Sequence, residues 1–249
     1  MNGLHLGLLG GLIASIATIA GAVLLIIFKE YLKIAALAEL RIDFFVGLLL
    51  IVTSVSLLYP NIIDKTINLS IATFFLGVLF FLLSKNILKN ILETIAINNI
   101  NEQKTILFIL TLILRAIPIG LAAGASMNLS HTGEANSLLT ILAFHNLFSG
   151  AAVAIGFLAI GFDPVITILG ALTSGIVALV SGLFGGYISQ ESLTILSLVI
   201  AFSGGALMST TLFDLLKFTK IKSQKISLGS SFASVSIVML IFIVWKELL

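Results

Sequence analysis

The chain has 249 residues, of which 59% are hydrophobic and 10% are charged, and its formal net charge is +2. A soluble domain carries about 25% charged residues, so this composition excludes an ordinary soluble protein and indicates a surface that faces lipid. Without cysteine, disulfides and thiolate metal sites are excluded, and without a basic patch a nucleic-acid partner is not expected. We expect an all-α polytopic membrane protein, because lipid-facing backbone must satisfy its own hydrogen bonds.

Membrane-spanning segments are expected wherever about 20 mostly apolar residues occur together. The sequence predicts a single transmembrane domain over residues 1–249. Its eight spans, in chain order, are 5–27, 42–59, 67–87, 105–126, 136–160, 164–187, 192–216 and 227–245. An even number of spans places both termini on the same side of the membrane. The sequence thus predicts the lipid bilayer as the first partner of the protein.

Basic residues gather in the connections that follow the first, third and seventh spans. Ten of the thirteen lie there: Lys29, Lys33, Arg41, Lys85, Lys89, Lys104, Lys217, Lys220, Lys222 and Lys225. The opposite side holds only Lys65 and Lys246. The positive-inside rule therefore predicts that both termini lie outside. The residue usage, rich in isoleucine, lysine and asparagine, is compatible with a bacterial inner (plasma) membrane.

An internal repeat relates the first two spans to the sixth and seventh. The segment Gly11–Gly21 aligns with Gly175–Gly185, and Gly47–Ser56 aligns with Gly205–Asp214. Because five spans separate the copies, they cross the membrane in opposite directions. This pattern predicts an inverted repeat, helices 1–3 and 6–8 around helices 4–5, as in many transporters. The alternative is that small residues recur only because they let helices pack closely.

One charged residue, Arg115, lies near the middle of the span 105–126, three residues before Pro118. An ionised side chain at the bilayer centre costs roughly 2.5–3.5 kcal/mol on insertion scales. A chain that keeps such a residue uses it for a solute or gate contact, or for a structural ion pair or carbonyl clamp at the Pro118 kink. The sequence leaves both interpretations open.

The following span carries His145, Asn146 and Ser149. His145 and Ser149 are four residues apart and share a helix face, and we expect His145 and Arg115 to face each other near the midplane. The alternatives are a transport pathway lined by Arg115, Pro118, His145, Asn146 and Ser149, or ordinary interhelical hydrogen bonds. No nucleotide loop, zinc-protease motif or nucleophile elbow occurs, so we expect no enzyme, no catalytic residues and no cofactor.

At these residues the chain resembles the ZIP (Zrt/Irt-like) metal transporter family. The segment Arg115-Ala-Ile-Pro-Ile-Gly120 is similar in placement to that family's helix 4 motif His-Asn-x-Pro-Glu-Gly. His145-Asn-Leu-Phe-Ser-Gly150 is similar to its helix 5 motif, and Ser174-Gly to a helix 6 pattern. The resemblance implies eight helices, both termini outside, and transport of a divalent metal ion of the zinc type.

The departures from the family pattern fall on the metal-ligand positions. There this chain has Arg115, Ala116, Ile119, Asn146, Ser149 and Ala178. Only His145 remains as a metal ligand, whereas zinc requires three or four. At 4 Å and an effective dielectric of 20, two unit charges interact by about 4 kcal/mol, and a dication doubles that repulsion. The sequence predicts a degenerate site in which Arg115 replaces a ligand.

Three functions follow from this pattern. The first is a transporter of altered substrate, which moves a less positive solute or binds a metal through carbonyls and hydroxyls. The second is a non-transporting regulator or scaffold in which Arg115 locks the pathway. The third is an unrelated permease for a small solute. Beside the bilayer, the partners that the sequence leaves open are a divalent metal ion, another small solute and a second copy in a homodimer.

Overall fold

The structure is a computed structural model that describes residues 2–32, 67–94, 100–129 and 133–220. Every regular element in these ranges is helical, which confirms the predicted all-α class. The helices are α1 (Gly3–Leu32), α5 (Ile67–Thr94), α6 (Ile100–Ser126), α7 (Gly133–Ile160), α8 (Pro164–Ser189) and α9 (Leu193–Lys220). A short 3-10 turn, η1 (Met127–Leu129), follows α6.

Five of the described helices are long and apolar enough to cross a membrane. The crossing segments are Gly3–Phe28, Asn68–Leu88, Ile109–Ser126, Leu138–Leu158 and Pro164–Ser189, and α9 contributes a shorter apolar stretch, Thr194–Leu207. By these lengths and compositions the chain is an integral membrane protein. The predicted spans 42–59 and 227–245, and the Gly47–Ser56 part of the repeat, lie outside the described residues.

Several helices extend beyond the spans that the sequence predicts. The first runs to Leu32 instead of ending near residue 27, and the third runs to Thr94 instead of residue 87. Hydropathy marks only the part of a helix that crosses the hydrocarbon. At 1.5 Å per residue, the 30 residues of α1 measure about 45 Å, against a hydrocarbon core of about 30 Å. The extra turns carry polar and basic residues suited to the membrane interface.

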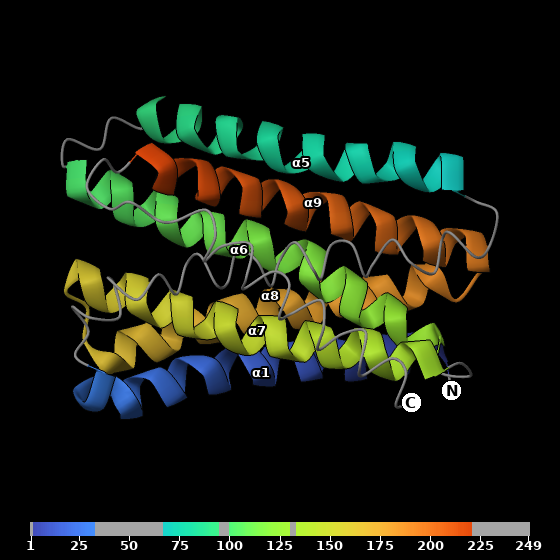
Figure 1. The fold of residues 1–249 in the computed structure, drawn as a ribbon, viewed down its shortest axis with the longest axis horizontal. Helices are drawn as coiled ribbons and strands as arrows, with labels where there is room; N and C mark the ends of the chain where they lie inside the picture. Colours follow the sequence, from blue (N-terminus) through green and yellow to red (C-terminus); the bar gives the residue numbers. More distant parts are fainter. Residues whose placement is uncertain (1, 33–66, 95–99, 130–132, 221–249) are drawn as a thin grey trace.

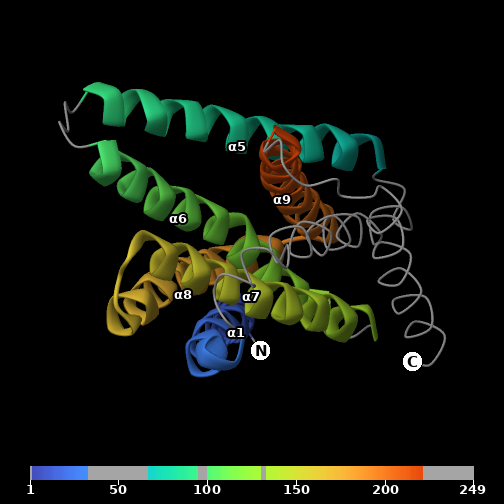
Figure 2. The same cartoon turned by 60° about the vertical axis from the view of Figure 1, so that its left-hand side comes forward.

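The helices divide into a four-helix group and an attached pair. Helix α8 packs between α1 and α6, and α7 packs against α1 (Figure 1). On the other side of α6, α5 pairs with α9, and α9 connects this pair to α6 (Figure 2). The four-helix group of α1, α6, α7 and α8 is therefore the part of the described bundle in which each helix packs against several others.

Close backbone contact holds α1 against α8 in an antiparallel pair. A Cβ atom added to Gly11 would lie 2.8 Å from the carbonyl oxygen of Leu179, and one added to Gly175 would lie 2.6 Å from the Ser15 hydroxyl. Within a bilayer no hydrophobic effect drives helices together, so small residues that permit such contact supply the packing energy. The glycines quoted for the repeat therefore also serve as packing residues.

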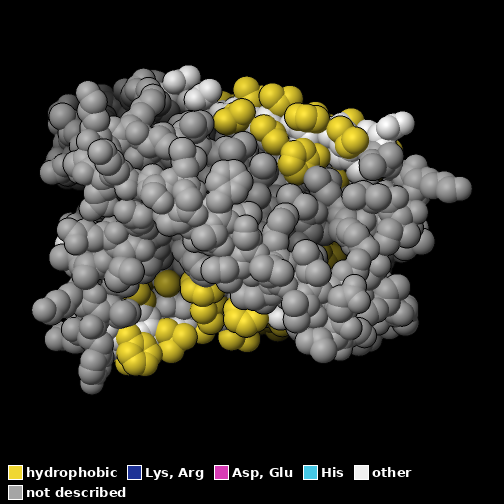
Figure 3. Space-filling model, in the orientation of Figure 1, with side chains coloured by type: hydrophobic (Ala, Val, Ile, Leu, Met, Phe, Trp, Pro, Cys, Tyr) yellow, Lys and Arg dark blue, Asp and Glu magenta, His cyan; other side chains and the backbone are white. Residues whose placement is uncertain are grey.

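The exposed face of the described helices suits lipid. Large apolar side chains point outward along α5 and α1, among them Phe75 and Ile16, which are 60% and 63% exposed. In Figure 3, hydrophobic side chains cover the described surface at the upper edge, where α5 lies, and at the lower edge. A soluble protein rarely leaves contiguous apolar surface of this extent, whereas a membrane protein requires it.

Asp163 begins α8 as its N-cap, with Pro164 in the first turn. Its carboxylate accepts a hydrogen bond of 2.8 Å from the Ile166 amide. We expect Asp163→Ala to destabilise the protein by about 1 kcal/mol, because the Ile166 amide then loses its hydrogen-bond acceptor. The thermal unfolding midpoint in detergent measures this loss. Asp163→Asn keeps an acceptor oxygen and is the matched control; equal losses in both variants would contradict the capping role.

Candidate functional site

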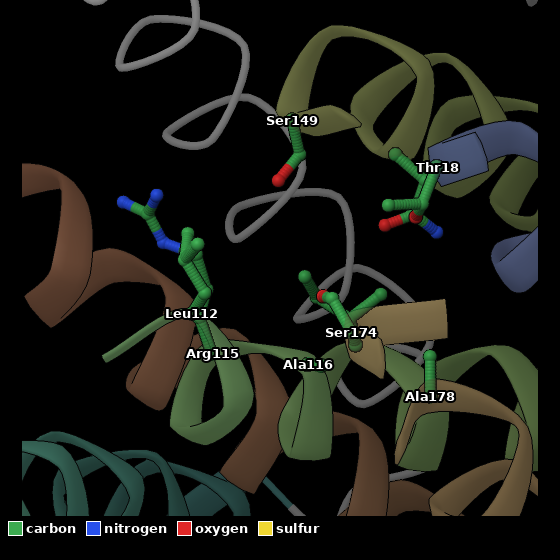
Figure 4. A pocket seen from close by; sticks show the side chains of 9 residues that line it. Thr18, Leu112, Arg115, Ala116, Ser149, Ser174 and Ala178 are labelled. Atoms are coloured by element: carbon green, nitrogen blue, oxygen red, sulfur yellow. The ribbon is translucent and has the colours of Figure 1, made fainter. Parts of the chain in front are cut away.

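A small polar cavity lies inside the four-helix group, and we call it the central cavity. It is lined by Thr18, Leu112, Arg115, Ala116, Ile119, Asn146, Ser149, Ser174 and Ala178. The space open to the centre of a water-sized sphere is about 10 Å³, which is room for about one water molecule. Figure 4 shows Arg115 rising from α6 at one side, Ser149 above, and Thr18 and Ser174 at the other side.

Helical spacing explains how these residues reach one place. Helix α6 contributes Leu112, Arg115, Ala116 and Ile119, which recur every three or four residues and so share a face. Helix α7 contributes a pair three residues apart, and α8 contributes a pair four residues apart, by the same rule. Helix α1 adds Thr18. The cavity is therefore a meeting point of four helix faces.

All six positions at which the family resemblance expects metal ligands line the central cavity. They are Arg115, Ala116, Ile119, Asn146, Ser149 and Ala178. These residues come from three helices, and the alignment with the family motifs alone predicted them. The residues that differ from the family pattern therefore lie around one cavity. Their role in transport stays a prediction.

Two residues predicted for the pathway, Pro118 and His145, do not line this cavity. Pro118 is buried within α6. His145 is 0% exposed, and neither of its ring nitrogens has a hydrogen-bond partner among the described residues.

Three lining residues were predicted neither as pathway residues nor as family ligand positions: Thr18, Leu112 and Ser174. Each had a sequence signal. Leu112 lies one turn before Arg115, Ser174 lies one turn before Ala178, and Thr18 is a hydroxyl in the middle of an apolar helix. Residues one turn from a site residue on the same helix share its face, so extending each motif by one turn identifies the first two.

The polar groups of the cavity are three hydroxyls, one amide and one guanidinium. The Thr18 hydroxyl donates to the carbonyl oxygen of Ala14 at 3.0 Å. The amide nitrogen of Asn146, a residue that is 1% exposed, has no partner among the described residues. The Arg115 guanidinium adds five N–H groups and a positive charge. No carboxylate occurs among the described lining residues.

The described residues offer no ligand set for a metal ion. They contain no group of three or more His, Cys, Asp or Glu side chains able to hold one. Zinc in proteins takes three or four such ligands, and His145, the only metal ligand that the sequence suggests, lies outside the cavity lining. The described part of the site therefore does not fit a zinc-type ion bound in the usual manner.

A second, larger cavity lies beside the first, between α6, α7 and α8, and we call it the side cavity. Its volume is about 190 Å³, and its lining is mostly apolar: Ile109, Leu112, Ile113, Phe157, Ile166, Leu169, Gly170, Thr173 and Ser174. The two cavities share Leu112 and Ser174. These two side chains therefore form the wall between an apolar space and the polar central cavity.

Comparison with known proteins assigns no role to this site. No protein-family model matches the chain, and no curated protein matches it. The function must therefore be argued from the residues and the geometry of the two cavities. The strongest observation is that a small polar cavity, lined in part by Arg115, lies where four helices of an integral membrane protein meet.

Proposed function

We propose that the protein is a membrane transporter of ZIP-like architecture whose solute passes through the central cavity. The observation that carries this proposal is the convergence of six motif positions from α6, α7 and α8 on one buried site. Unrelated helices with scattered small residues have no reason to bring these positions together. Polar and ionisable residues kept inside a membrane commonly mark a solute path.

The pairing of α1 with α8 supports the inverted repeat on which this architecture depends. The aligned segments Gly11–Gly21 and Gly175–Gly185 lie on these two helices. The two helices run antiparallel in contact, with Gly11 against Leu179 and Gly175 against Ser15. Helices related by an inverted repeat cross the membrane in opposite directions, and sites between such repeats are typical of transporters.

The side cavity supports a route from one face of the membrane to the site. It lies along the first half of the membrane-crossing part of α6, near Ile109, and along the start of α8, near Ile166. In the orientation that the positive-inside rule predicts, both segments lie in the cytoplasmic half of the bilayer. The side cavity then serves as an inner vestibule, and Leu112 and Ser174 form the gate at its inner end.

A second candidate function is a non-transporting regulator or scaffold in which Arg115 closes the path. The narrowness of the central cavity, with about 10 Å³ for a water-sized sphere, favours it. The two candidates differ in whether any solute crosses. Flux through the purified protein distinguishes them directly.

Flux measurements in liposomes test the proposed function. The full chain is reconstituted and challenged with divalent metals, small anions and small neutral solutes, and we expect flux of at least one above protein-free vesicles. The Ser174→Phe variant is expected to abolish that flux, because a ring at the shared wall fills the narrow cavity. Val180→Phe, at a 45% exposed position of the same helix, is the matched control. If no solute on the panel crosses, the transporter proposal is wrong.

A further inference from the structure

The side cavity opens on the face of α8 that points toward lipid. Exposed large apolar side chains of α8 recur every three or four residues and so share one face, among them Leu169, Leu172, Ile176 and Val180. This face belongs to the membrane-crossing segment Pro164–Ser189. Ile166 and Leu169, which are 41% and 53% exposed, also line the side cavity. The side cavity is therefore a hollow in a lipid-facing surface, open from the side.

The lining of the side cavity suits hydrocarbon. It consists mostly of isoleucine, leucine and phenylalanine side chains, and no charged side chain occurs among the described residues that line it. The Thr173 hydroxyl donates a hydrogen bond of 2.9 Å to the carbonyl oxygen of Leu169, so this donor is already used within α8. Lipid tails are as apolar as leucine. A hydrocarbon chain therefore meets a lining of its own polarity.

The size of the side cavity fits part of one hydrocarbon chain. Its volume is about 190 Å³. In another protein, an apolar cavity of about 150 Å³ stays free of water and binds benzene. An apolar space without an occupant deprives the side chains around it of van der Waals contacts. The flexible end of a single acyl chain fits this volume and restores those contacts.

The depth of the side cavity matches the tails of one lipid leaflet. On α8 its lining runs from Ile166 to Ser174, which is about 12 Å along the helix axis at 1.5 Å per residue. It begins two residues after Pro164, where the membrane-crossing segment starts. One leaflet contributes about 15 Å to a hydrocarbon core of about 30 Å. A lipid of that leaflet can therefore keep its headgroup at the interface while one tail turns into the side cavity.

From these observations we infer that the side cavity binds one acyl chain of a membrane phospholipid. The chain enters past Ile166 and Leu169 and ends against the inner wall formed by Leu112 and Ser174. Binding of the lipid does not depend on the proposed function and can be measured without transport. Only one consequence rests on that function: the same space is the proposed vestibule, so a bound chain must leave it before a solute can pass.

Native mass spectrometry of the purified full-length protein tests the binding. After extraction and washing in lipid-free detergent, we expect the wild type to retain one phospholipid per chain. Leu169→Trp should lower the retained fraction by roughly tenfold, because the indole occupies the volume that the acyl chain fills. Leu172→Trp is the matched control, since it makes the same exchange at a 39% exposed position outside the cavity lining. If Leu169→Trp does not fold, Thr173→Phe fills the same cavity and gives the same discrimination.

Three results would overturn the inference. The first is a wild-type protein that retains no phospholipid. The second is equal retention by Leu169→Trp and Leu172→Trp, because the lipid would then lie elsewhere on the surface. The third is retention of a free fatty acid or of detergent alone in the side cavity, because the occupant would then not be a phospholipid.

Flux in liposomes separates this inference from the proposed function. Retained phospholipid together with solute flux supports both. Retained phospholipid without flux of any solute supports the lipid site and overturns the transporter proposal. Flux of a solute through a protein that retains no phospholipid supports the transporter and overturns the lipid site.

Discussion

The Gly182→Val variant is expected to lose most of its folded protein. Gly182 lies where α8 crosses α1: a Cβ atom added there would lie 2.7 Å from the Cα atom of Gly11 and 3.0 Å from the carbonyl oxygen of Gly7. Its own carbonyl oxygen is in turn the nearest neighbour that a Cβ atom on Gly124 of α6 would meet. A side chain at position 182 thus pushes backbone against backbone.

The loss of stability in Gly182→Val depends on which neighbouring atoms can move to make room for the new side chain. Overpacking a core costs roughly 1–3 kcal/mol where neighbouring side chains can adjust. At Gly182 the neighbours are main-chain atoms of α1, so a whole helix must shift, and we expect a loss at or above the upper end of that range. The measurement is the yield of monodisperse protein after detergent extraction, together with its thermal midpoint.

A matched control exists on the same helix. Val180 is 45% exposed, so Val180→Leu enlarges a side chain of α8 that faces outward. We expect this variant to keep the wild-type yield and midpoint. A Gly182→Val protein that extracts and unfolds like Val180→Leu would show that α1 and α8 are not in close backbone contact.

The sequence predicted the described spans well because length and composition alone identify a membrane helix. For α8 the predicted span 164–187 and the observed Pro164–Ser189 nearly coincide, since Asp163 and Pro164 form a recognisable start. For α1 and α5 the membrane-crossing segments, Gly3–Phe28 and Asn68–Leu88, also lie close to the predicted spans 5–27 and 67–87, but the helices themselves are longer. There the helix continues into polar residues that hydropathy does not count as part of a span.

The sequence predicted the site residues correctly where the spacing along a single helix determines which side chains share a face. Fixed spacing places Arg115, Ala116 and Ile119 on one face whatever surrounds them, and all three line the cavity. Which way a helix is rotated against its neighbours is a tertiary property. Thr18 was missed for this reason, because its place depends on the contact between its backbone and Gly150 of α7.

His145 illustrates the same limit. Successive residues of a helix point about 100° apart, since a turn takes 3.6 residues, so the rotation of α7 decides which of His145 and Asn146 points more directly at the cavity. The contact of Gly150 with Thr18, and of Gly21 with the carbonyl of Leu147, fixes the rotation of α7 against α1. In that rotation Asn146 lines the cavity and His145 does not. Periodicity alone does not distinguish these two rotations.

The second prediction with a large expected effect is that a variant of the central cavity gains the ability to bind a metal ion. A triple variant, Arg115→His with Ala116→Asn and Ile119→Glu, introduces the helix 4 motif of the ZIP family that the segment resembles, and we expect it to bind a divalent cation. All three positions line the central cavity. The variant removes the guanidinium and supplies an imidazole and a carboxylate, which are ligand types that zinc takes in proteins, together with an amide oxygen on the same helix face. We expect binding to rise from undetectable to micromolar, which corresponds to a binding free energy of about −8 kcal/mol.

Isothermal titration with zinc measures this binding, and the matched control replaces Ile119→Glu by Ile119→Gln in the same triple variant. Glutamine has nearly the shape of glutamate but no charge, so the control should bind zinc far more weakly. If the triple variant binds no more zinc than the wild type, the register taken from the family motif is wrong. If it binds zinc, the central cavity has the position and dimensions of a metal site, and Arg115 is the residue that prevents the wild-type protein from binding a metal ion there.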